Sequence, residues 1–290
     1  MKIRSFLFTI RMKLLRNLFL LLSRVNVMNS EDTVKAIKNR HLSVSRFGDG
    51  EFKVIFGIGN EFQTPDSRLA TRLAEILKSS NPDVLVCIPY ALCDMSHLCE
   101  KATSFWRTFV GANFLKLTRI LSKKTIYGDA SFTRFYMDYQ DKSDRKVFFS
   151  SIKEIWNERD VYIVEGEKSC LGVGNDIFDN TKSIHRLLCP SRDAFNSYDS
   201  ILEACNENIP KGALVLCALG MTATVLAYDL AMTGYQAIDI GHLDVEYEWM
   251  RMGALEKCSI PGKAVNEAGN VSDYSLEDSE YKKSIVTIIK

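Results

Sequence analysis

The sequence predicts an α/β protein: one domain built on a mostly parallel β-sheet, with helices on both faces. Two observations support this fold class. Short apolar stretches typical of buried strands recur along the chain, and the stretches between them carry apolar residues at helical spacing. No internal repeat, low-complexity tract or Pro/Ser-rich linker interrupts the alternation, so a single domain is the simplest interpretation.

The composition is that of an ordinary globular protein. The 290 residues are 46% hydrophobic and 25% charged, which allows one large domain or two modest ones. A net charge of +1 argues against a nucleic-acid partner, which would require a concentrated basic surface. Eight cysteines without a C-x-x-C pair indicate buried free thiols in a reducing compartment, so we expect a cytoplasmic protein.

The N-terminal segment, residues 1–28, differs from the domain expected over 29–290. Its longest wholly apolar run, 18–22, is far shorter than the ~20 residues that a membrane-spanning helix needs. Its first 24 residues contain six basic side chains and no acidic one. We expect a peripheral helix on an anionic membrane surface, at the inner face of the cell membrane. The alternative is a helix that packs on the domain, or a disordered segment.

The first half of the chain gives three strands and several helices. Ser30, as N-cap, begins a helix of about 30–40 because early acidic residues suit the helix dipole. Residues 53–65 contain two glycines and a proline, and we expect a loop able to fold over a ligand. The remaining elements are strands at 42–47, 84–88 and 125–128, and helices at 66–79, 92–121 and 147–157.

The second half continues the alternation. A helix begins at Ser191, and another opens at Gly220 and Thr222 and ends at Gly234. Strands are expected at 160–164, 184–189, 213–218 and 236–240, with a final edge strand at 284–289. Because ligands of parallel α/β sheets bind beyond the carboxyl ends of the strands, polar residues that follow these strands are candidate site residues.

The first candidate is the turn Gly48-Asp49-Gly50-Glu51, directly after a strand. Its glycines allow the backbone to turn sharply and to approach a ligand. Asp49 and Glu51 supply the hard oxygen ligands that suit Mg²⁺ or Mn²⁺. The alternative is an acidic turn with both side chains in water.

Two further strand ends carry glycine-rich turns. The run from Gly172 to Asp176 resembles a phosphate-binding loop, with Gly174, Asn175 and Asp176 as candidates, but it lacks the third glycine of a dinucleotide motif. A loop with special backbone angles and an Asn/Asp helix cap fits equally well. Thr222 could present a helix N-terminus to a phosphate, or simply cap that helix.

The densest polar segment is 241–249. If it is extended, alternation places His242, Asp244, Glu246 and Glu248 on one face, where they could complete a metal shell or supply a base. A structural histidine on a solvated acidic face is the alternative. Positive charge for a phosphate-bearing substrate could come from Arg46, Arg134 and Lys168, which could equally be surface charges paired with local acids.

Four segments together are similar to one known family. They are R-F-G-D-G-E at 46–51, G-V-G-N-D-I-F-D-N at 172–180, L-G-M-T-A-T-V-L-A-Y-D-L-A at 219–231 and D-I-G-H-L-D-V-E-Y-E-W at 239–249. In this order they resemble the bacterial GT-D type glycosyltransferases, whose hallmark is a D-x-E motif. The resemblance covers roughly 40–250. Met221 and Phe135 depart from the pattern, which leaves donor and acceptor preference open.

The resemblance implies a Rossmann-like sheet and a metal-dependent glycosyltransferase. A nucleotide-sugar donor, typically a UDP-sugar, would serve a glycan or lipid-linked acceptor in surface polysaccharide or glycoconjugate synthesis. Asp49 and Glu51 would hold Mn²⁺ or Mg²⁺, with His242 as a third ligand. Asp244 or Glu246 would be the base. The donor would contact Arg46, Gly48, Arg134, Lys168, Gly174, Asn175, Asp176 and Thr222. The alternatives are a metal-dependent phosphohydrolase and a non-enzymatic, membrane-associated nucleotide-binding protein.

Overall fold

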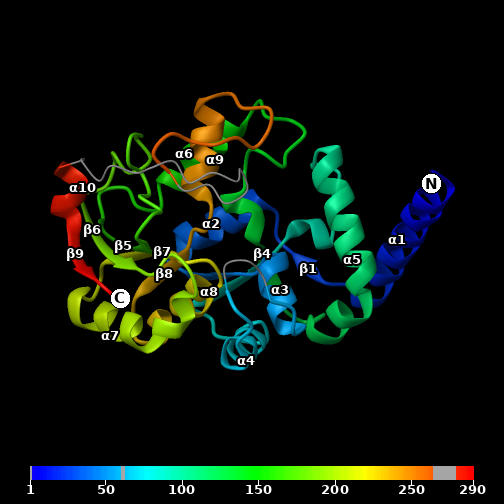
Figure 1. The fold of residues 1–290 in the computed structure, drawn as a ribbon, viewed down its shortest axis with the longest axis horizontal. Helices are drawn as coiled ribbons and strands as arrows, with labels where there is room; N and C mark the ends of the chain where they lie inside the picture. Colours follow the sequence, from blue (N-terminus) through cyan, green and yellow to red (C-terminus); the bar gives the residue numbers. More distant parts are fainter. Residues whose placement is uncertain (1, 60–62, 264–278) are drawn as a thin grey trace.

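The structure, a computed structural model, describes residues 2–59, 63–263 and 279–290. The described residues form one nine-stranded sheet in the order β1-β4-β3-β2-β8-β7-β5-β6-β9, and every strand pairing is parallel (Figure 1). The predicted fold class is therefore confirmed. The strands are β1 Asn26–Val27, β2 Ser43–Arg46, β3 Val84–Ile88, β4 Ile126–Asp129, β5 Asp160–Gly166, β6 Ser183–Cys189, β7 Leu214–Ala218, β8 Gln236–Asp239 and β9 Ile285–Ile288.

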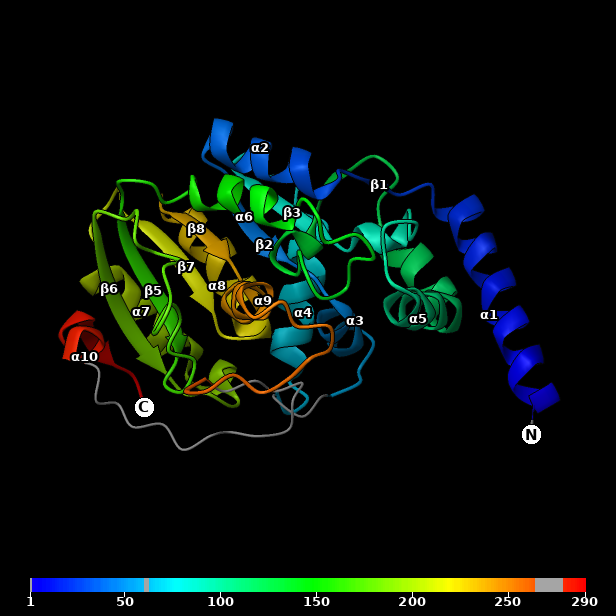
Figure 2. The same cartoon turned by 90° about the horizontal axis from the view of Figure 1, so that it is seen from above.

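Helices connect the strands and cover both faces of the sheet (Figure 2). One face packs on α3, α4, α5, α7 and α8, and the other on α2, α6 and α9, each through its own apolar core. The helices are α1 Lys2–Ser23, α2 Ser30–Arg40, α3 Asp49–Ile55, α4 Ser67–Ile76, α5 Glu100–Ile120, α6 Arg145–Lys153, α7 Tyr198–Asn208, α8 Met221–Met232, α9 Leu243–Arg251 and α10 Ser279–Ser284, with 3-10 turns η1 Tyr90–Leu92, η2 Ala130–Thr133 and η3 Ala194–Ser197.

The sheet has its topological switch point between β2 and β8. These strands are neighbours, although they are far apart in sequence. The helix that follows β2 is α3, on one face, whereas the helix that follows β8 is α9, on the other. Chains that leave adjacent strands toward opposite faces open a crevice at the carboxyl edge, where ligands of such sheets bind.

Several predicted elements have different bounds in the structure. The N-cap of α2 is Asn29, whose side chain accepts from Asp32 N at 2.7 Å, and not Ser30. The loop expected at 53–65 is helical as far as Ile55, and its residues 60–62 lie outside the described part. The helix expected from 92 begins at Glu100, after a 3-10 turn. The two-residue strand β1 was not predicted.

Helix α1 packs against α5 at one end of the molecule (Figures 1 and 2). Met12 and Phe19, two turns apart on α1, are buried in this contact. A Cβ atom at Gly111 of α5 would lie 2.7 Å from the carbonyl oxygen of Met12, so the two helices approach closely there. No helix among the described residues is long and apolar enough to cross a membrane.

Candidate active site

Arg46, the last residue of β2, is held at the switch point by contacts with three other segments. Its Nε lies 4.0 Å from Asp239 Oδ1 at the end of β8, and its guanidinium donates to Thr133 Oγ1 of η2. A Cβ atom at Gly241 would lie 2.6 Å from the Arg46 guanidinium, and Gly241 has a φ of +45°, so glycine is favoured there. The Arg46 side chain is 11% exposed. The fold therefore fixes a positive charge at the carboxyl ends of two central strands.

Helix α8 also contacts Arg46 and Asp239, through Thr224. Thr224 Oγ1 lies 2.8 Å from the Arg46 carbonyl oxygen and 3.2 Å from Asp239 Oδ2, within hydrogen-bond range of both. The backbone N–H of Gly241 donates to Asp239 Oδ1 at 3.0 Å. Burial raises the pKa of Asp239, and the charge of Arg46 acts in the opposite direction. Asp239 is thus a buried carboxylate with a specific set of partners.

The D-x-E turn forms the first turn of α3 and not a free loop. Gly48 is the N-cap, and its N–H donates to Glu51 Oε2 at 2.6 Å, as in a capping box. Asp49 Oδ2 lies 2.6 Å from Lys53 Nζ, one turn further along the helix. Both predicted carboxylates therefore sit at a helix N-terminus, at the edge of the switch-point crevice.

Glu51 shows the electrostatic character of this turn. Burial raises its pKa to about 7, and the negative charge of Asp239 acts in the same direction. The Gly48 N–H and the charge of Arg46 oppose the shift. A carboxylate whose pKa is raised by burial and by a neighbouring negative charge is a place where an added cation is favourable.

The structure places His242 next to Arg134 rather than in a ready-made metal cluster. Arg134 Nη2 lies 3.2 Å from His242 Nδ1, which must accept because a guanidinium only donates. Across the described residues, no three His, Cys, Asp or Glu side chains gather in a group that could hold a metal ion. The roles predicted for His242 and Arg134 remain predictions.

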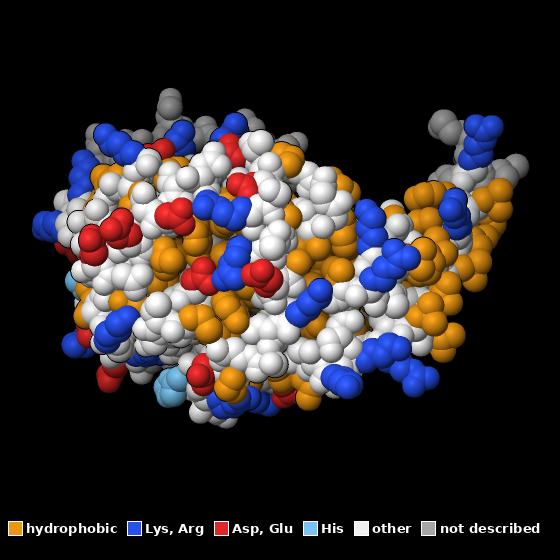
Figure 3. All heavy atoms as spheres, turned by 90° about the horizontal axis from the view of Figure 1, so that it is seen from below, with side chains coloured by type: hydrophobic (Ala, Val, Ile, Leu, Met, Phe, Trp, Pro, Cys, Tyr) orange, Lys and Arg blue, Asp and Glu red, His pale blue; other side chains and the backbone are white. Residues whose placement is uncertain are grey.

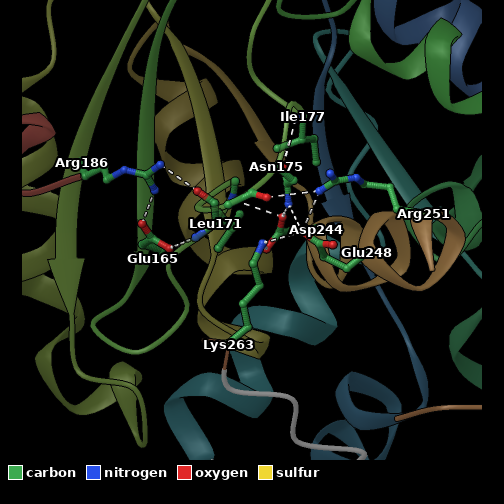
Figure 4. Close-up of polar contacts among 11 residues, drawn as sticks. Glu165, Leu171, Asn175, Ile177, Arg186, Asp244, Glu248, Arg251 and Lys263 are labelled. Carbon is green, nitrogen blue, oxygen red and sulfur yellow. Dashed lines mark hydrogen bonds and ion pairs between the residues drawn. The ribbon is translucent and has the colours of Figure 1, made fainter. Parts of the chain in front are cut away.

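The predicted extended face at 241–249 was wrong, because Leu243–Arg251 form helix α9. Asp244 and Glu248, one helical turn apart, both accept from the Asn175 amide, at 2.8 and 2.6 Å (Figure 4). Lys263 Nζ lies 2.5 Å from Asp244 Oδ2, and Gly172 N lies 3.1 Å from Asp244 Oδ1. Both oxygens of Asp244 are thus engaged in holding two segments on α9.

Glu246 points away from that cluster. Its Oε2 accepts from the backbone N–H groups of Tyr136 and Met137, at 2.9 and 2.8 Å. Its Oε1 is buried and has no hydrogen-bond partner in the described part of the chain. Burial raises the pKa of Glu246 to about 7, partly offset by the charge of Arg134. Of the two carboxylates predicted as the base, Glu246 is the one with an unengaged oxygen.

The raised pKa makes stability depend on pH with a definite sign. Folded Glu246 binds a proton up to about pH 7, whereas the unfolded side chain loses it near its ordinary value of 4.5. Its stabilising contribution is therefore full below that ordinary value and is lost as pH rises through 7. Glu246→Gln removes this titration. Between about pH 5 and pH 8, the free energy of unfolding of this variant should therefore fall by up to about 3 kcal/mol less than that of the wild type. Denaturant titrations at both pH values measure this.

Glu154→Gln is the matched control, because the Glu154 side chain, which pairs with Lys38, is 60% exposed. It should leave the pH dependence of the wild type unchanged. An unaltered slope in Glu246→Gln would contradict the raised pKa.

The predicted phosphate-binding loop, residues 172–176, forms side-chain hydrogen bonds with residues of α9. Asn175 binds Asp244 and Glu248, and Asp176 accepts from the Tyr247 hydroxyl at 2.6 Å. Gly174 adopts a φ of +77°, with open space where a Cβ would lie. These three residues line a cavity of about 1480 Å³ that also reaches Arg186 and Tyr281.

Two other predicted donor contacts come from the loop after β5 and from the start of α8. Lys168 is exposed after β5, which is separated from β2 by β7 and β8. Thr222 is buried in the first turn of α8, and Gly220, the N-cap of that helix, has a φ of +54°. Among the described residues, no hydrogen bond or ion pair joins either side chain to Asp49 or Glu51.

Sequence reasoning missed three residues that organise the site. Asp239 was assigned only to a strand, although an acidic residue inside an apolar strand is itself a signal, since buried carboxylates need partners. Thr133 and Thr224 carried no sequence signal, because their partner Arg46 is far away in the chain.

Comparison with known proteins decides the family. A family model described as the glycosyltransferase GT-D fold matches residues 44–268. The chain belongs to this family. A solved structure of the domain of unknown function 1792, described as a distinct glycosyltransferase fold, is 39% identical, covers 94% of this chain and 98% of that one, and superposes with a TM-score of 0.88.

Two other similar proteins come from streptococci. A structure described as a new glycosyltransferase from Streptococcus sanguinis is 34% identical, with a TM-score of 0.87, over 92% of this chain and all of that one. Glycosyltransferase GlyD of Streptococcus pneumoniae is 38% identical over 91% of this chain. This chain spans 33% of the length of GlyD. The resemblance seen in the sequence, and the glycosyltransferase type it implied, are confirmed at the level of the family.

Proposed function

We propose that this GT-D domain transfers a sugar from a UDP-sugar to a glycan or lipid-linked acceptor, with Mn²⁺ or Mg²⁺ as cofactor, in surface polysaccharide or glycoconjugate synthesis. The observation that carries the proposal is the fixed guanidinium of Arg46. It lies at the switch point, directly before the D-x-E turn, with its position set by Asp239 and Thr133. A buried arginine at this edge of a parallel sheet suits a diphosphate, which it can bind in bidentate fashion.

The residues of the turn fit a divalent cation. Mg²⁺ in nucleotide enzymes is typically held by one or two carboxylates together with substrate phosphates and water, so a complete protein cage is not required. Asp49 and Glu51 supply such a pair of oxygen donors. The negative charge of Asp239 helps to raise the pKa of Glu51, so an added positive charge is favoured beside Glu51. When bound, the cation would neutralise charge on the donor diphosphate.

The chain's own residues would then perform three tasks. Arg46 would stabilise the negative charge that develops on the departing UDP. Arg134, which directly follows η2, would contribute to the same task. The acceptor hydroxyl would form the new bond to the anomeric carbon as the bond to the diphosphate breaks. Glu246 is our candidate for the base that takes the hydroxyl proton, because it has an unengaged oxygen and a pKa raised to about 7. That oxygen is buried, so acceptor binding would have to expose it. Asp244 would position Asn175 and Lys263.

A hydrolysis screen across UDP-sugars tests the proposal. Slow Mn²⁺-dependent release of UDP and free sugar from one or a few donors is the expected result. Release of inorganic phosphate from phosphate esters instead would favour the phosphohydrolase alternative. No UDP release from any donor, together with no effect of UDP on the melting temperature, would contradict the proposed activity.

We also infer that α1 binds an anionic membrane surface. Leu14 and Leu21 lie two turns apart and are 63% and 66% exposed, on the side away from the buried Met12 and Phe19. Figure 3 shows apolar and basic side chains next to one another along this projecting helix. The helix has Lys and Arg side chains beside apolar ones and no acidic residue. The basic side chains would bind anionic lipid headgroups, and the apolar side chains would insert at the boundary with the acyl chains.

Vesicle flotation measures this binding. The wild type should float with phosphatidylglycerol vesicles and much less with phosphatidylcholine vesicles. Leu14→Asp/Leu21→Asp should lower the bound fraction at least about tenfold, since each buried leucine contributes about 1.5–3 kcal/mol. The control is Val147→Asp/Leu255→Asp, at sites 73% and 85% exposed elsewhere on the molecule. Equal loss in both double variants, or no loss in either, would refute the inference.

A further inference from the structure

A second cavity lies at the same edge of the sheet as Arg46. It has a volume of about 600 Å³ and is lined by the residues that follow β3, by the N-termini of α2 and α6, and by the segment after η2. Three rings form part of its wall. His97 lies between Tyr90 and Tyr139, with ring centroids 5.5 and 5.0 Å apart. The cavity is therefore walled by flat aromatic surfaces.

A buried hydrogen-bond network forms its base. Asp129, at the end of β4, accepts from Tyr90 N at 2.9 Å and from the Ser30 hydroxyl. Ser30 Oγ lies 3.0 Å from the Tyr139 hydroxyl. These contacts fix the positions of two of the three rings, so the wall is held in place by the fold.

Polar atoms in the wall lack partners. His97 Nδ1 and the Nε and Nη1 atoms of Arg145 are buried and make no hydrogen bond within the described residues. Burial lowers the pKa of His97, so its ring is neutral near pH 7 and presents one donor and one acceptor. These two cavity-lining side chains therefore keep hydrogen-bonding capacity that no described residue uses.

The charges in the lining decide which ligand class fits. Four carboxylates border the cavity, against the single guanidinium of Arg145: Glu31, Asp94, Asp141 and Asp144. A phosphate would meet repulsion from these groups. A sugar ring is uncharged, has C–H faces that stack on aromatic rings, and has hydroxyls that donate to carboxylates and to the amides of Asn29 and Gln140.

The cavity lies next to the proposed donor site. Tyr90 follows β3, the neighbour of β2, so it lies roughly 5–10 Å from the end of β2 at one to two strand spacings. The turn η2 connects the two places, because Ser131 N donates to Asp129 while Thr133 contacts Arg46. We propose that this cavity binds an uncharged sugar ring, and that, resting on the proposed function, this ring is the end of the glycan acceptor.

Saturation-transfer NMR with methyl glycosides of glucose, galactose and N-acetylglucosamine tests the proposal on the full chain. At least one glycoside should give a signal. Tyr90→Ala should weaken glycoside binding at least about tenfold, and Gln140→Ala should weaken it about threefold. Tyr90→Phe keeps the aromatic ring and should bind the glycoside as the wild type does. The matched control is Phe105→Ala, a 46% exposed aromatic residue in a different cavity. Gln140 is exposed, so its variant folds even if Tyr90→Ala does not.

The competing outcomes are distinct. Absence of signal from all three glycosides, or a signal unchanged in Gln140→Ala and Tyr90→Ala, overturns the proposal. So does loss of the signal on addition of UDP with Mn²⁺, because the sugar would then occupy the donor's place. Retention of the signal with UDP present supports an acceptor site. The UDP-dependent melting shift, measured on the same samples, reports on the proposed function alone, so the two fail separately.

Discussion

Arg46→Gln is expected to abolish detectable UDP binding and to lower the free energy of unfolding by about 3 to 5 kcal/mol. The stability loss follows because Asp239, with 5% of its side chain exposed, would remain buried near the site without a counter-charge. The loss of UDP binding follows because the diphosphate would lose a fixed positive charge that can bind it in bidentate fashion. Denaturant titration and calorimetric UDP titration measure the two effects.

Arg186→Gln separates stability from function. Arg186 Nη1 lies 2.5 Å from Glu165 Oε1, and both side chains are buried, but this ion pair joins β5 and β6 away from the switch point (Figure 4). We expect a similar loss of stability in this variant, with UDP binding retained under folding conditions. If Arg46→Gln binds UDP as well as Arg186→Gln does, Arg46 is not a donor ligand.

Lys263→Met is expected to lower the free energy of unfolding by about 3 to 5 kcal/mol. Lys263 and Asp244 are 2% and 4% exposed, and their ion pair is the shortest link between α9 and the segment that ends at Lys263 in the described chain. Without the ammonium, Asp244 would be a buried carboxylate bound only by Gly172 and Asn175. Denaturant titration at neutral pH measures the change.

The double variant Lys263→Met/Asp244→Asn is the decisive companion. It removes both charges, so it should recover at least half of the lost stability, and the two substitutions should be strongly non-additive. Additive losses would contradict an ion pair at this place. Asp244→Asn alone also tests chemistry: full transfer activity in that variant eliminates Asp244 as the base, as its engaged oxygens lead us to expect.

The strand pattern could be predicted from the sequence because burial dictates it. Residues 84–88 are apolar throughout, and all are buried in β3, between two other strands. A central parallel strand, covered on both faces, needs such a run. The same reasoning placed Asp49 and Glu51 at a strand's carboxyl end, although not on the helix that begins there.

The segment that became α9 shows where pattern reasoning was insufficient. Its acidic residues alternate with period two, which suggested an extended face, but Leu243 and Tyr247 are both buried at helical spacing. Two periodicities compete in so short a stretch, and tertiary packing decides between them. Glu246 is buried by contacts with Tyr136 and Met137, which no local pattern encodes.

The partners of the site residues could not be predicted, because they come from distant parts of the chain. Asp244 meets Lys263 and Gly172 only after α9 packs, and Arg46 meets Thr133 only through the arrangement of β2, β3 and β4. Sequence alone indicates which residue types could act. The fold decides which of them have oxygens or nitrogens left to act with.

Calorimetric titration of UDP in the presence of Mn²⁺, with Glu51→Ala beside the wild type, tests the central claim most directly. The control is Glu100→Ala, an acidic residue in the first turn of another helix, α5. The account predicts that UDP binds the wild type and Glu100→Ala only when Mn²⁺ is present, and does not bind Glu51→Ala. UDP binding that is unchanged by chelating the metal, or unchanged in Glu51→Ala, would contradict it.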